Sequence, residues 1–318
     1  MSTVAIIGAG LIGQGWAIVF ARRNWQVRLF DVDPAMSIQA KALILQQLRA
    51  LEAYGLLDHA EDIGKRVSVT ASLEAALAGA DYIQENSPEK VDIKKALFSE
   101  LDALADPDAI IGSSTSSIAA SLFTEHLAGR HRCLVVHPVN PPYLIPLVEL
   151  CGAPWTNTAV VDRARDIMLE IGQRPVKVNK EIEGFVLNRL QGALLHEAFR
   201  LFEAGIASAE DIDATIKDGL GLRWSFMGPF ETIDLNAPGG LSDYCARYGR
   251  LYQSIGASQA TCVPWQGALV EDLHQQRRTL IPEDTLQQRR FWRDERLMQL
   301  MRHKQEFERD ECVNALKN

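Results

Sequence analysis

Residues 3–13 read TVAIIGAGLIG, a β-branched apolar run that ends in three glycines with the spacing GxGxxG. An apolar run without polar alternation is typical of a strand buried on both faces of a parallel sheet. A helical pattern follows to about residue 24, and Asp31 closes a second strand-like run over residues 26–31. The glycines therefore join a strand to a helix, and in that setting GxGxxG indicates a dinucleotide-binding turn.

Each residue of this turn has its own expected role. Gly8 permits the tight turn, Gly10 lets the backbone approach a pyrophosphate, and Gly13 allows the helix to pack closely on the strand. The helix begins with Leu11 and Ile12, and its first amides are expected to face the phosphates. These five residues form the predicted cofactor-binding loop.

Asp31 decides which dinucleotide is expected. Its carboxylate is placed to accept hydrogen bonds from the adenosine ribose, and its charge would repel the 2′-phosphate of NADP, with Asp33 adding to that field. We therefore predict NAD. FAD uses the same fingerprint and is the rival cofactor, and a glycine-rich turn that binds nothing is the other alternative.

Strand-like and helical segments alternate through the first half of the chain, which predicts an α/β fold with a Rossmann-type domain. Further strands are expected at residues 67–70, 81–85, 109–113, 133–137, 147–150 and 176–178, and helices at residues 38–54, 73–77, 93–104 and 160–171. Strand-like runs nearly vanish after residue 184. We predict an NAD-binding domain over residues 1–182 and an all-helical substrate and dimerisation domain over residues 183–318.

The predicted second domain carries three local signals. Its first helix, residues 185–203, is apolar enough to be buried, and Ser208, three residues before Asp211, resembles a capping box that opens the next helix. The tail over residues 286–318 predicts an amphipathic helix laid over a core or a partner subunit. The apolar side of that helix would contain Trp292, Leu297, Met298 and Met301.

Composition excludes several classes of protein. The 318 residues carry 33 Lys and Arg against 41 Asp and Glu, a net charge of -8 that argues against a nucleic-acid binder. No run approaches the roughly 20 apolar residues that span a bilayer. The cysteines are odd in number and widely spaced, without a CxxC pair that would suggest a metal site, and we expect a soluble cytoplasmic protein. They are Cys133, Cys151, Cys245, Cys262 and Cys312.

The candidate catalytic base is His137, which ends the expected strand at residues 133–137. Ligands of open α/β sheets bind outside the carboxyl ends of strands, so this histidine is expected over the cofactor crevice. Oxidation of an alcohol requires a base for the hydroxyl proton, and histidine suits that role near neutral pH. Glu149 is a charge in an apolar strand and needs a partner, either His137 as in a catalytic triad or Arg189. A core histidine held by backbone is the alternative for His137.

Several motifs together resemble the L-3-hydroxyacyl-CoA dehydrogenase superfamily, from the first strand to about Leu235. The motifs are HPVNPP at residues 137–142, LVE at 147–149, STSS at 114–117, GFVLNRL at 184–190 and GPFE at 228–231. The longer string over residues 137–150, GLGLR at 219–223 and the tail most resemble the branch of lambda-crystallin and L-gulonate 3-dehydrogenase. That resemblance covers nearly the whole chain.

The resemblance implies roles for further residues. Ser116 and Asn188 would bind the substrate oxygen as donors, and Asn140 within the HPVNPP motif is assigned to the same substrate site. Glu89 and Lys94 align with cofactor-contacting positions. Without the family, Ser116 is equally a helix cap and Asn188 a buried helix polar group. Ser114 stands where acyl-CoA enzymes usually carry asparagine, which puts its contact with the nicotinamide end in doubt.

Two features favour a free hydroxy acid over an acyl-CoA. Arg223 offers a planar fork that can bind a carboxylate, although it is equally a surface residue. Residues 34–66 lack a dense basic cluster for coenzyme A phosphates, because Lys41, Arg49, Lys65 and Arg66 are scattered. We predict oxidation of L-gulonate or a similar acid by a homodimer. The alternatives are a short-chain hydroxyacyl-CoA or carnitine dehydrogenase, or a non-catalytic crystallin-like protein.

Overall fold

The computed structural model describes residues 1–261 and 263–315, with side chains as far as Phe307. Contacts group the chain into two compact units. The first contains Met1–Arg189 and the C-terminal segment from Phe291, and the second is Leu190–Arg290. This grouping differs from a division at residue 182, because residues 183–189 and most of the last helix belong with the first unit.

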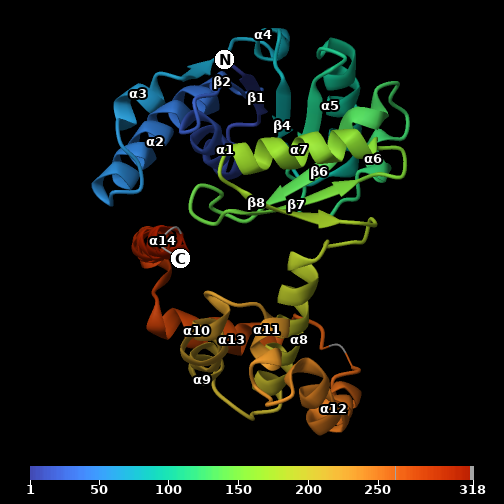
Figure 1. Ribbon diagram of the computed structural model, residues 1–318, viewed down its shortest axis with the longest axis vertical. Helices are drawn as coiled ribbons and strands as arrows, with labels where there is room; N and C mark the ends of the chain where they lie inside the picture. The colour runs from blue at the N-terminus through green and yellow to red at the C-terminus, as the bar shows by residue number, and fades with distance from the viewer. Residues whose placement is uncertain (262, 316–318) are drawn as a thin grey trace. The chain divides into compact units, whose positions relative to one another are not determined.

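The first unit is built on one eight-stranded sheet with the order β3-β2-β1-β4-β5-β6-β7-β8 (Figure 1). The α/β fold class and all eight predicted strands are confirmed, with ends that move by one or two residues. The strands are β1 (Thr3–Ile7), β2 (Gln26–Phe30), β3 (Val67–Val69), β4 (Tyr82–Glu85), β5 (Ile110–Ser113), β6 (Cys133–Pro138), β7 (Leu147–Gly152) and β8 (Arg174–Val178).

Helices cover both faces of this sheet. Val4 and Ile6 of β1 belong to one core cluster, and Ala5 and Ile7 to another, because successive side chains of a strand point to opposite faces. The first cluster includes residues of α1 (Leu11–Ala21), α2 (Pro34–Ala53), α3 (Ala60–Gly64) and α7 (Thr158–Glu170). The second includes residues of α4 (Leu73–Leu77), α5 (Val91–Leu104) and α6 (Ser121–Thr124). The strand β1, buried on both faces, therefore lies at the centre of the fold.

The order of strands reverses at β1, which pairs in parallel with β2 on one side and with β4 on the other. Such a switch point opens a crevice at the carboxyl ends of the strands. All neighbouring strands run parallel except β6 and β7, whose antiparallel pairing the sequence pattern did not predict. Only residues 139–146 connect them, and a parallel crossover needs a dozen residues or more.

The second unit is helical, as predicted. Its elements are the greater part of α8 (Leu187–Glu203), α9 (Ala209–Ala214), a π-helical turn (Thr215–Leu220), α10 (Gly221–Trp224), α11 (Pro229–Asp234), α12 (Gly240–Ser258), α13 (Ala268–Leu280) and a 3-10 turn (Glu283–Thr285). Ser208 caps α9 by accepting a hydrogen bond from the Asp211 amide at 3.1 Å, which confirms the predicted helix start.

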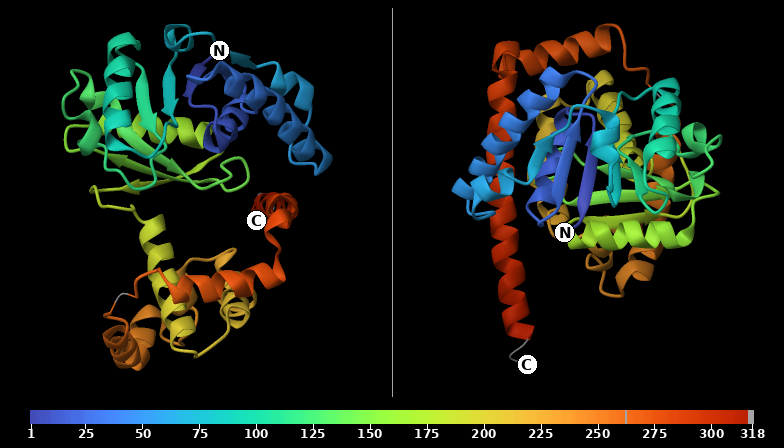
Figure 2. Two further views of the ribbon diagram at one scale, coloured as in Figure 1. Left: turned by 180° about the vertical axis from the view of Figure 1, so that it is seen from behind. Right: turned by 90° about the horizontal axis from the view of Figure 1, so that it is seen from above.

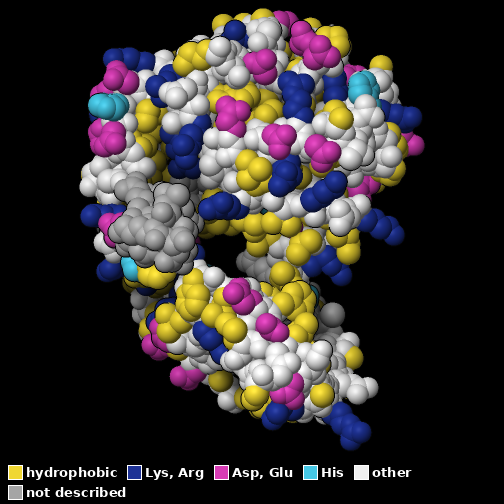
Figure 3. Space-filling model, viewed as in Figure 1, with side chains coloured by type: hydrophobic (Ala, Val, Ile, Leu, Met, Phe, Trp, Pro, Cys, Tyr) yellow, Lys and Arg dark blue, Asp and Glu magenta, His cyan; other side chains and the backbone are white. Residues whose placement is uncertain are grey.

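The prediction that the first helix of this unit is buried is wrong. The helix α8 contains no buried residue, and Leu190 and Leu194 are 62% and 37% exposed. Its apolar side chains line one face of the helix, and the described residues of the chain leave that face partly exposed. Figure 3 shows hydrophobic side chains on the surface of this unit.

The tail forms a single long helix, α14 (Leu286–Ala315), as predicted, although Trp292 of its expected apolar side is 41% exposed (Figure 2). Met298 is only 3% exposed and belongs to the core cluster that contains α1, α2 and α7, with Leu297 packed partly against it. Of the two coverings expected for this helix, a core in the same chain is therefore the one observed. Residues 316–318 lie outside the described part.

Two further observations concern the whole chain. No helix among residues 1–261 and 263–315 has both the length and the apolar character needed to cross a bilayer. Cys133, Cys151 and Cys245 carry free thiols, and burial raises the pKa of Cys133 and of Cys151 to about 12 each. Cys262 and the side chain of Cys312 lie outside the described residues.

Candidate active site

The predicted cofactor loop follows β1 and has the geometry that each glycine requires. Gly8 has a φ of +97°, and a Cβ there would lie 2.8 Å from the carbonyl oxygen of Asn86. A Cβ on Gly13 would lie 1.9 Å from the Gly8 carbonyl oxygen. A Cβ on Gly10, by contrast, would meet nothing within 4 Å. Gly8 and Gly13 are therefore required by the fold itself, whereas Gly10 leaves open space in which a ligand can approach the backbone.

The helix α1 begins at this open space with its amides unoccupied by side chains. Gly10 is its N-cap and offers no side-chain acceptor, and the first turn holds no acidic residue. Leu11 and Ile12 supply the first amides, and Leu11 is 68% exposed. Free amides at the positive end of a helix dipole fit an anionic pyrophosphate.

Asp31 lies at the carboxyl end of β2 and is fixed to the glycine loop. Its Oδ2 accepts a hydrogen bond from the Ala9 amide at 2.7 Å, and its Oδ1 accepts one from the Asp33 amide at 3.1 Å. The Asp33 carboxylate is exposed and accepts from the Ala35 amide at 2.9 Å, which caps α2. Two carboxylates thus lie where the adenosine ribose of a bound dinucleotide is expected, a charge pattern that disfavours a 2′-phosphate.

His137 and Glu149 form a buried pair on neighbouring strands. They are register partners in the antiparallel ladder of β6 and β7, and the distance from His137 Nδ1 to Glu149 Oε2 is 2.8 Å. The two residues are 6% and 2% exposed. The other oxygen, Glu149 Oε1, accepts hydrogen bonds from the amides of Val186 and Leu187. Of the two partners expected for Glu149, His137 is therefore the one observed.

The electrostatics of this pair favour an ionised carboxylate. Burial alone would raise the pKa of Glu149, but the hydrogen bonds from His137, Leu187 and Val186 outweigh it, and the pKa is lowered overall. An ionised Glu149 accepts a hydrogen bond from the Nδ1–H of His137, which leaves the lone pair on Nε2 free to take up a proton. That arrangement is the one a general base needs.

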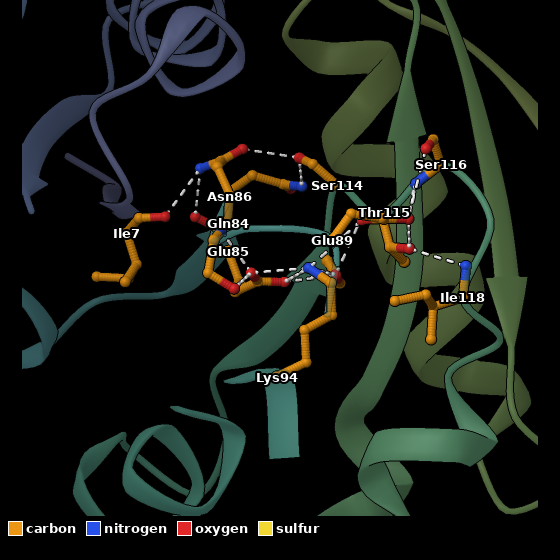
Figure 4. Close-up of polar contacts among 12 residues, drawn as sticks. Ile7, Gln84, Glu85, Asn86, Glu89, Lys94, Ser114, Thr115, Ser116 and Ile118 are labelled. Atoms are coloured by element: carbon orange, nitrogen blue, oxygen red, sulfur yellow. Dashed lines mark hydrogen bonds and ion pairs between the residues drawn. The ribbon is translucent and has the colours of Figure 1, made fainter. Parts of the chain in front are cut away.

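Ser116 and Asn188, the two predicted substrate donors, lie together. The Asn188 side-chain amide donates to the Ser116 carbonyl oxygen at 2.7 Å. Ser116 in turn donates its amide to Glu89 Oε1 at 2.9 Å, with its hydroxyl 3.4 Å from the same oxygen (Figure 4). Asn188 and Glu89 therefore fix the Ser116 backbone from its two sides.

Lys94, which aligns with a cofactor-contacting position in the family, is buried and lies against carboxylates of its own chain. It is 1% exposed, and its Nζ lies 3.0 Å from each carboxylate oxygen of Glu85 and 3.9 Å from Glu89 Oε2 (Figure 4). Glu85 also accepts a hydrogen bond from the Ser113 hydroxyl. Glu85 and Ser113 were not among the predicted site residues. Glu85 could have been found because it is a carboxylate in a strand with no exposed residue, and a buried charge requires a partner.

Ser114 is held within a second group of polar side chains. Its hydroxyl accepts from the Trp16 indole at 2.9 Å and from the Gln84 amide at 2.7 Å, and donates to Asn86 Oδ1 at 2.8 Å. The Asn86 side chain also donates to the carbonyl oxygens of Ile7 and Gln84 (Figure 4). These contacts join the carboxyl ends of β1, β4 and β5, and sequence reasoning missed Trp16, Gln84 and Asn86.

The remaining two predicted substrate residues are both exposed. Asn140 is exposed on the connection between β6 and β7. Arg223 belongs to the second unit, where it is exposed on α10 close enough to Tyr244 to lower the pKa of that hydroxyl, although the hydrogen bond with Tyr252 raises it overall. Their assignment to the substrate site stays a prediction.

Comparison with known proteins identifies what the chain is similar to. Residues 3–182 match the model of the 3-hydroxyacyl-CoA dehydrogenase NAD binding domain, and residues 184–280 match the C-terminal domain of the same family. The first match confirms NAD as the cofactor, and the open space at Gly10 with the free start of α1 fits its pyrophosphate.

Two related sequences and one solved structure illustrate the range of proteins to which the chain is similar. The lambda-crystallin homolog of Bos taurus is 42% identical over 309 residues, which is 96% of each chain. L-carnitine dehydrogenase of Pseudomonas putida is 38% identical and covers 78% of this chain and 77% of its own. Among solved structures, the NAD+-dependent dismutase 5-formyl-3-hydroxy-2-methylpyridine 4-carboxylic acid 5-dehydrogenase superposes with a TM-score of 0.82 and 29% identity, over 97% of this chain and 99% of that one.

Proposed function

The chain belongs to the 3-hydroxyacyl-CoA dehydrogenase family, and from this we propose that it oxidises the 3-hydroxyl of a small L-3-hydroxy acid. L-Gulonate is the first candidate, and the product would be the 3-keto acid. The observation that carries the proposal is the buried His137 and Glu149 pair at the carboxyl end of β6, with 2.8 Å between Nδ1 and Oε2. A protein that only binds a nucleotide has no need for a base with its own carboxylate.

In the proposed mechanism, Nε2 of His137 removes the hydroxyl proton as the bond between carbon 3 and its hydrogen breaks. NAD+ held at the loop from Gly8 to Gly13 would supply the acceptor for that hydrogen as a hydride, and the carbon–oxygen single bond would become a carbonyl. The imidazolium formed on His137 is stabilised by the ionised Glu149 at Nδ1. The Glu149 carboxylate keeps its charge throughout and holds the ring in one orientation.

Ser116 and Asn188 are the proposed donors to the substrate oxygen. The second N–H of the Asn188 amide remains available after the Asn188 bond to the Ser116 carbonyl, and the Ser116 hydroxyl would turn to the substrate from its long, 3.4 Å contact with Glu89 Oε1. Donors fixed in advance stabilise charge that develops on an oxygen without reorganising during the reaction. Asn140 is assigned to the same site because it follows His137 within the HPVNPP motif.

The local ion pairs and hydrogen bonds of the basic residues near α2 favour a free acid over a coenzyme A thioester as substrate. Arg49 is paired with Glu61 at 2.7 Å and Lys65 with Asp62 at 2.8 Å. Arg66 donates to the carbonyl oxygen of Ala21 at 2.9 Å. These cations are already engaged locally and do not form a phosphate-binding cluster.

A carnitine or short-chain hydroxyacyl-CoA dehydrogenase is the second candidate. It is favoured by the 38% identity to a protein named L-carnitine dehydrogenase. Both candidates use the same base and cofactor. They differ in what recognises the rest of the substrate, and for a free acid Arg223 is the proposed carboxylate ligand.

A substrate panel with an Arg223→Met variant tests this choice. We expect NADH absorbance to report a higher kcat/KM for L-gulonate or L-3-hydroxybutyrate than for 3-hydroxybutyryl-CoA or L-carnitine. In Arg223→Met the KM for the free acid should rise by about 10- to 100-fold, because a bidentate contact between charged groups is worth on the order of 1.5–3 kcal/mol. An unchanged KM would remove Arg223 from the site, and a preference for the thioester would reject the substrate class while leaving the base in place.

We also propose that two copies of the chain associate through the second unit. Within its described residues only Ala209, Thr232 and Ala237 are buried, whereas Phe226 and Phe230 are 73% and 76% exposed. Monomeric proteins rarely leave so large an apolar surface uncovered, and closed two-fold dimers are the commonest way to cover it. Light scattering at micromolar concentration should give twice the mass of the chain, and Phe230→Glu should lower it. A wild-type protein with the mass of a single chain would contradict the dimer.

A further inference from the structure

Charged side chains gather at the carboxyl ends of β4 and β5, outside the base pair already described. Glu85 and Lys94 are both fully buried there, 0% and 1% exposed. Lys94 Nζ lies 3.0 Å from each oxygen of Glu85, and Glu85 also accepts hydrogen bonds from Ser113 and from the Ser87 amide (Figure 4). Glu85 and Lys94 therefore neutralise each other, and their hydrogen-bonding capacity is filled.

Glu89 adds a third charge to this cluster that nothing neutralises fully. Its Oε1 accepts hydrogen bonds from uncharged donors, namely the Thr115 hydroxyl and the amides of Ser116 and Ser117. The cation nearest to it, Lys94, lies 3.9 Å from Oε2 and is closer to Glu85. With Glu85 and Glu89 ionised, the three charged groups sum to one negative charge.

The ionised state of Glu89 is supported by its surroundings. Partial burial would raise its pKa, but the Thr115 hydroxyl, the charge of Lys94 and the amides of Ser117 and Ser116 lower it overall. The Glu89 side chain is 38% exposed, so its charge reaches the solvent at the carboxyl ends of the strands and is not buried in the core.

The position of Glu89 places this charge on the nicotinamide half of a bound dinucleotide. Asp31 at the end of β2 marks the adenosine side, and the loop from Gly8 to Gly13 after β1 marks the pyrophosphate. A dinucleotide crosses the sheet at the switch point, so its other half extends over β4 and β5. Glu89 follows β4 and holds the Ser116 segment that follows β5.

We propose that the Glu89 carboxylate selects the oxidation state of the cofactor by favouring NAD+ over NADH. The oxidised nicotinamide ring carries a positive charge and the reduced ring does not, so an uncompensated negative charge nearby stabilises only the first. The buried pair of Lys94 and Glu85 holds the cluster in place without cancelling this charge. Reduction of the ring then removes the attraction, which favours release of NADH after each turnover. This inference needs NAD binding alone and does not depend on which hydroxy acid is the substrate.

The experiment compares the two cofactor forms in binding titrations without any substrate. The Kd of NADH is measured from its own fluorescence and the Kd of NAD+ by calorimetry, for the wild type and for Glu89→Gln. Glutamine keeps an acceptor oxygen for the Ser116 and Ser117 amides but removes the charge. We expect the Kd of NAD+ to rise on the order of tenfold, with the Kd of NADH within about twofold of the wild type.

Two matched variants separate charge from shape. Glu89→Asp keeps the charge on a shorter side chain, and the ratio of the two Kd values should stay close to that of the wild type. Glu100→Gln removes an exposed carboxylate from α5, the helix that follows Glu89, and should change neither Kd. Equal weakening of both cofactor forms in Glu89→Gln, or a ratio unchanged by it, would overturn the proposal. Failure of the hydroxy acid panel would leave these titrations unaffected, because they contain no hydroxy acid.

Discussion

His137→Ala is expected to reduce kcat by about 10²- to 10⁴-fold while NADH binding stays at the wild-type level, because a positioned general base contributes an acceleration of that size. The imidazole is 6% exposed and is bonded to Glu149, and its ring packs 5.8 Å from the buried ring of Phe185. None of its described contacts reaches the glycine loop that binds the cofactor. The measurement is steady-state turnover alongside NADH fluorescence titration.

A control and a rescue sharpen this result. His131→Ala makes the same substitution at an exposed histidine before β6 and should leave turnover unchanged. Added imidazole should restore part of the activity of His137→Ala, because the cavity left behind is lined by Glu149. An alanine variant that retains most of its turnover without imidazole would refute the assignment of the base.

Glu149→Gln is expected to lower kcat by a similar factor, for a different reason. A glutamine amide in place of Oε2 can donate to Nδ1 of His137, which moves the ring proton to Nε2 and leaves no lone pair facing the substrate. The shape of the side chain is preserved, so the KM for NAD+ should change little. Glu125→Gln at an exposed position is the matched control and should be silent. Normal turnover in Glu149→Gln would show that the tautomer of His137 is set elsewhere.

The loss of stability in Glu149→Gln relative to the wild type is expected to depend on pH. The folded pKa of Glu149 lies below its unfolded value of about 4.3, so the ionised carboxylate stabilises the fold at neutral pH. That contribution is fully present above the unfolded value and is lost as the pH falls through the folded value. The difference in Tm between wild type and Glu149→Gln should therefore be largest near pH 7 and shrink below about pH 4.3. A constant difference across this range would contradict the lowered pKa.

Local patterns predicted the parts of the fold that local forces decide. After Thr3 the strand is apolar throughout because β1 is covered on both faces, and the bounds Thr3–Ile7 match the predicted strand. Gly8 is required by its φ of +97° and Gly13 by its close approach to the Gly8 carbonyl within the same loop, so the motif alone was enough to place them. The pairing of His137 with Glu149 was one of two options from the sequence, because composition cannot measure a distance between strands.

The failures have a common physical cause, which is dependence on partners distant in sequence. The apolar face of α8 predicted burial, but hydrophobicity does not say which surface covers a helix. In β4, Gln84 and Glu85 are adjacent polar residues in a fully buried strand, and only the fold shows that they point to different partners. Gln84 donates to Ser114, whereas Glu85 binds Lys94. Neither partner could be named from the strand alone.

The antiparallel ladder that holds His137 opposite Glu149 has a consequence for how such enzymes diversify. The pair is aligned by backbone hydrogen bonds along β6 and β7, while residues 139–146 close the hairpin between them with Tyr143 and Leu144 anchored in the core. On the proposed function, exchanges at the exposed Asn140 would change what the substrate meets, while His137 and Glu149 keep their alignment. The same fold can thereby change its specificity among alcohols of different size and charge and keep the same catalytic pair.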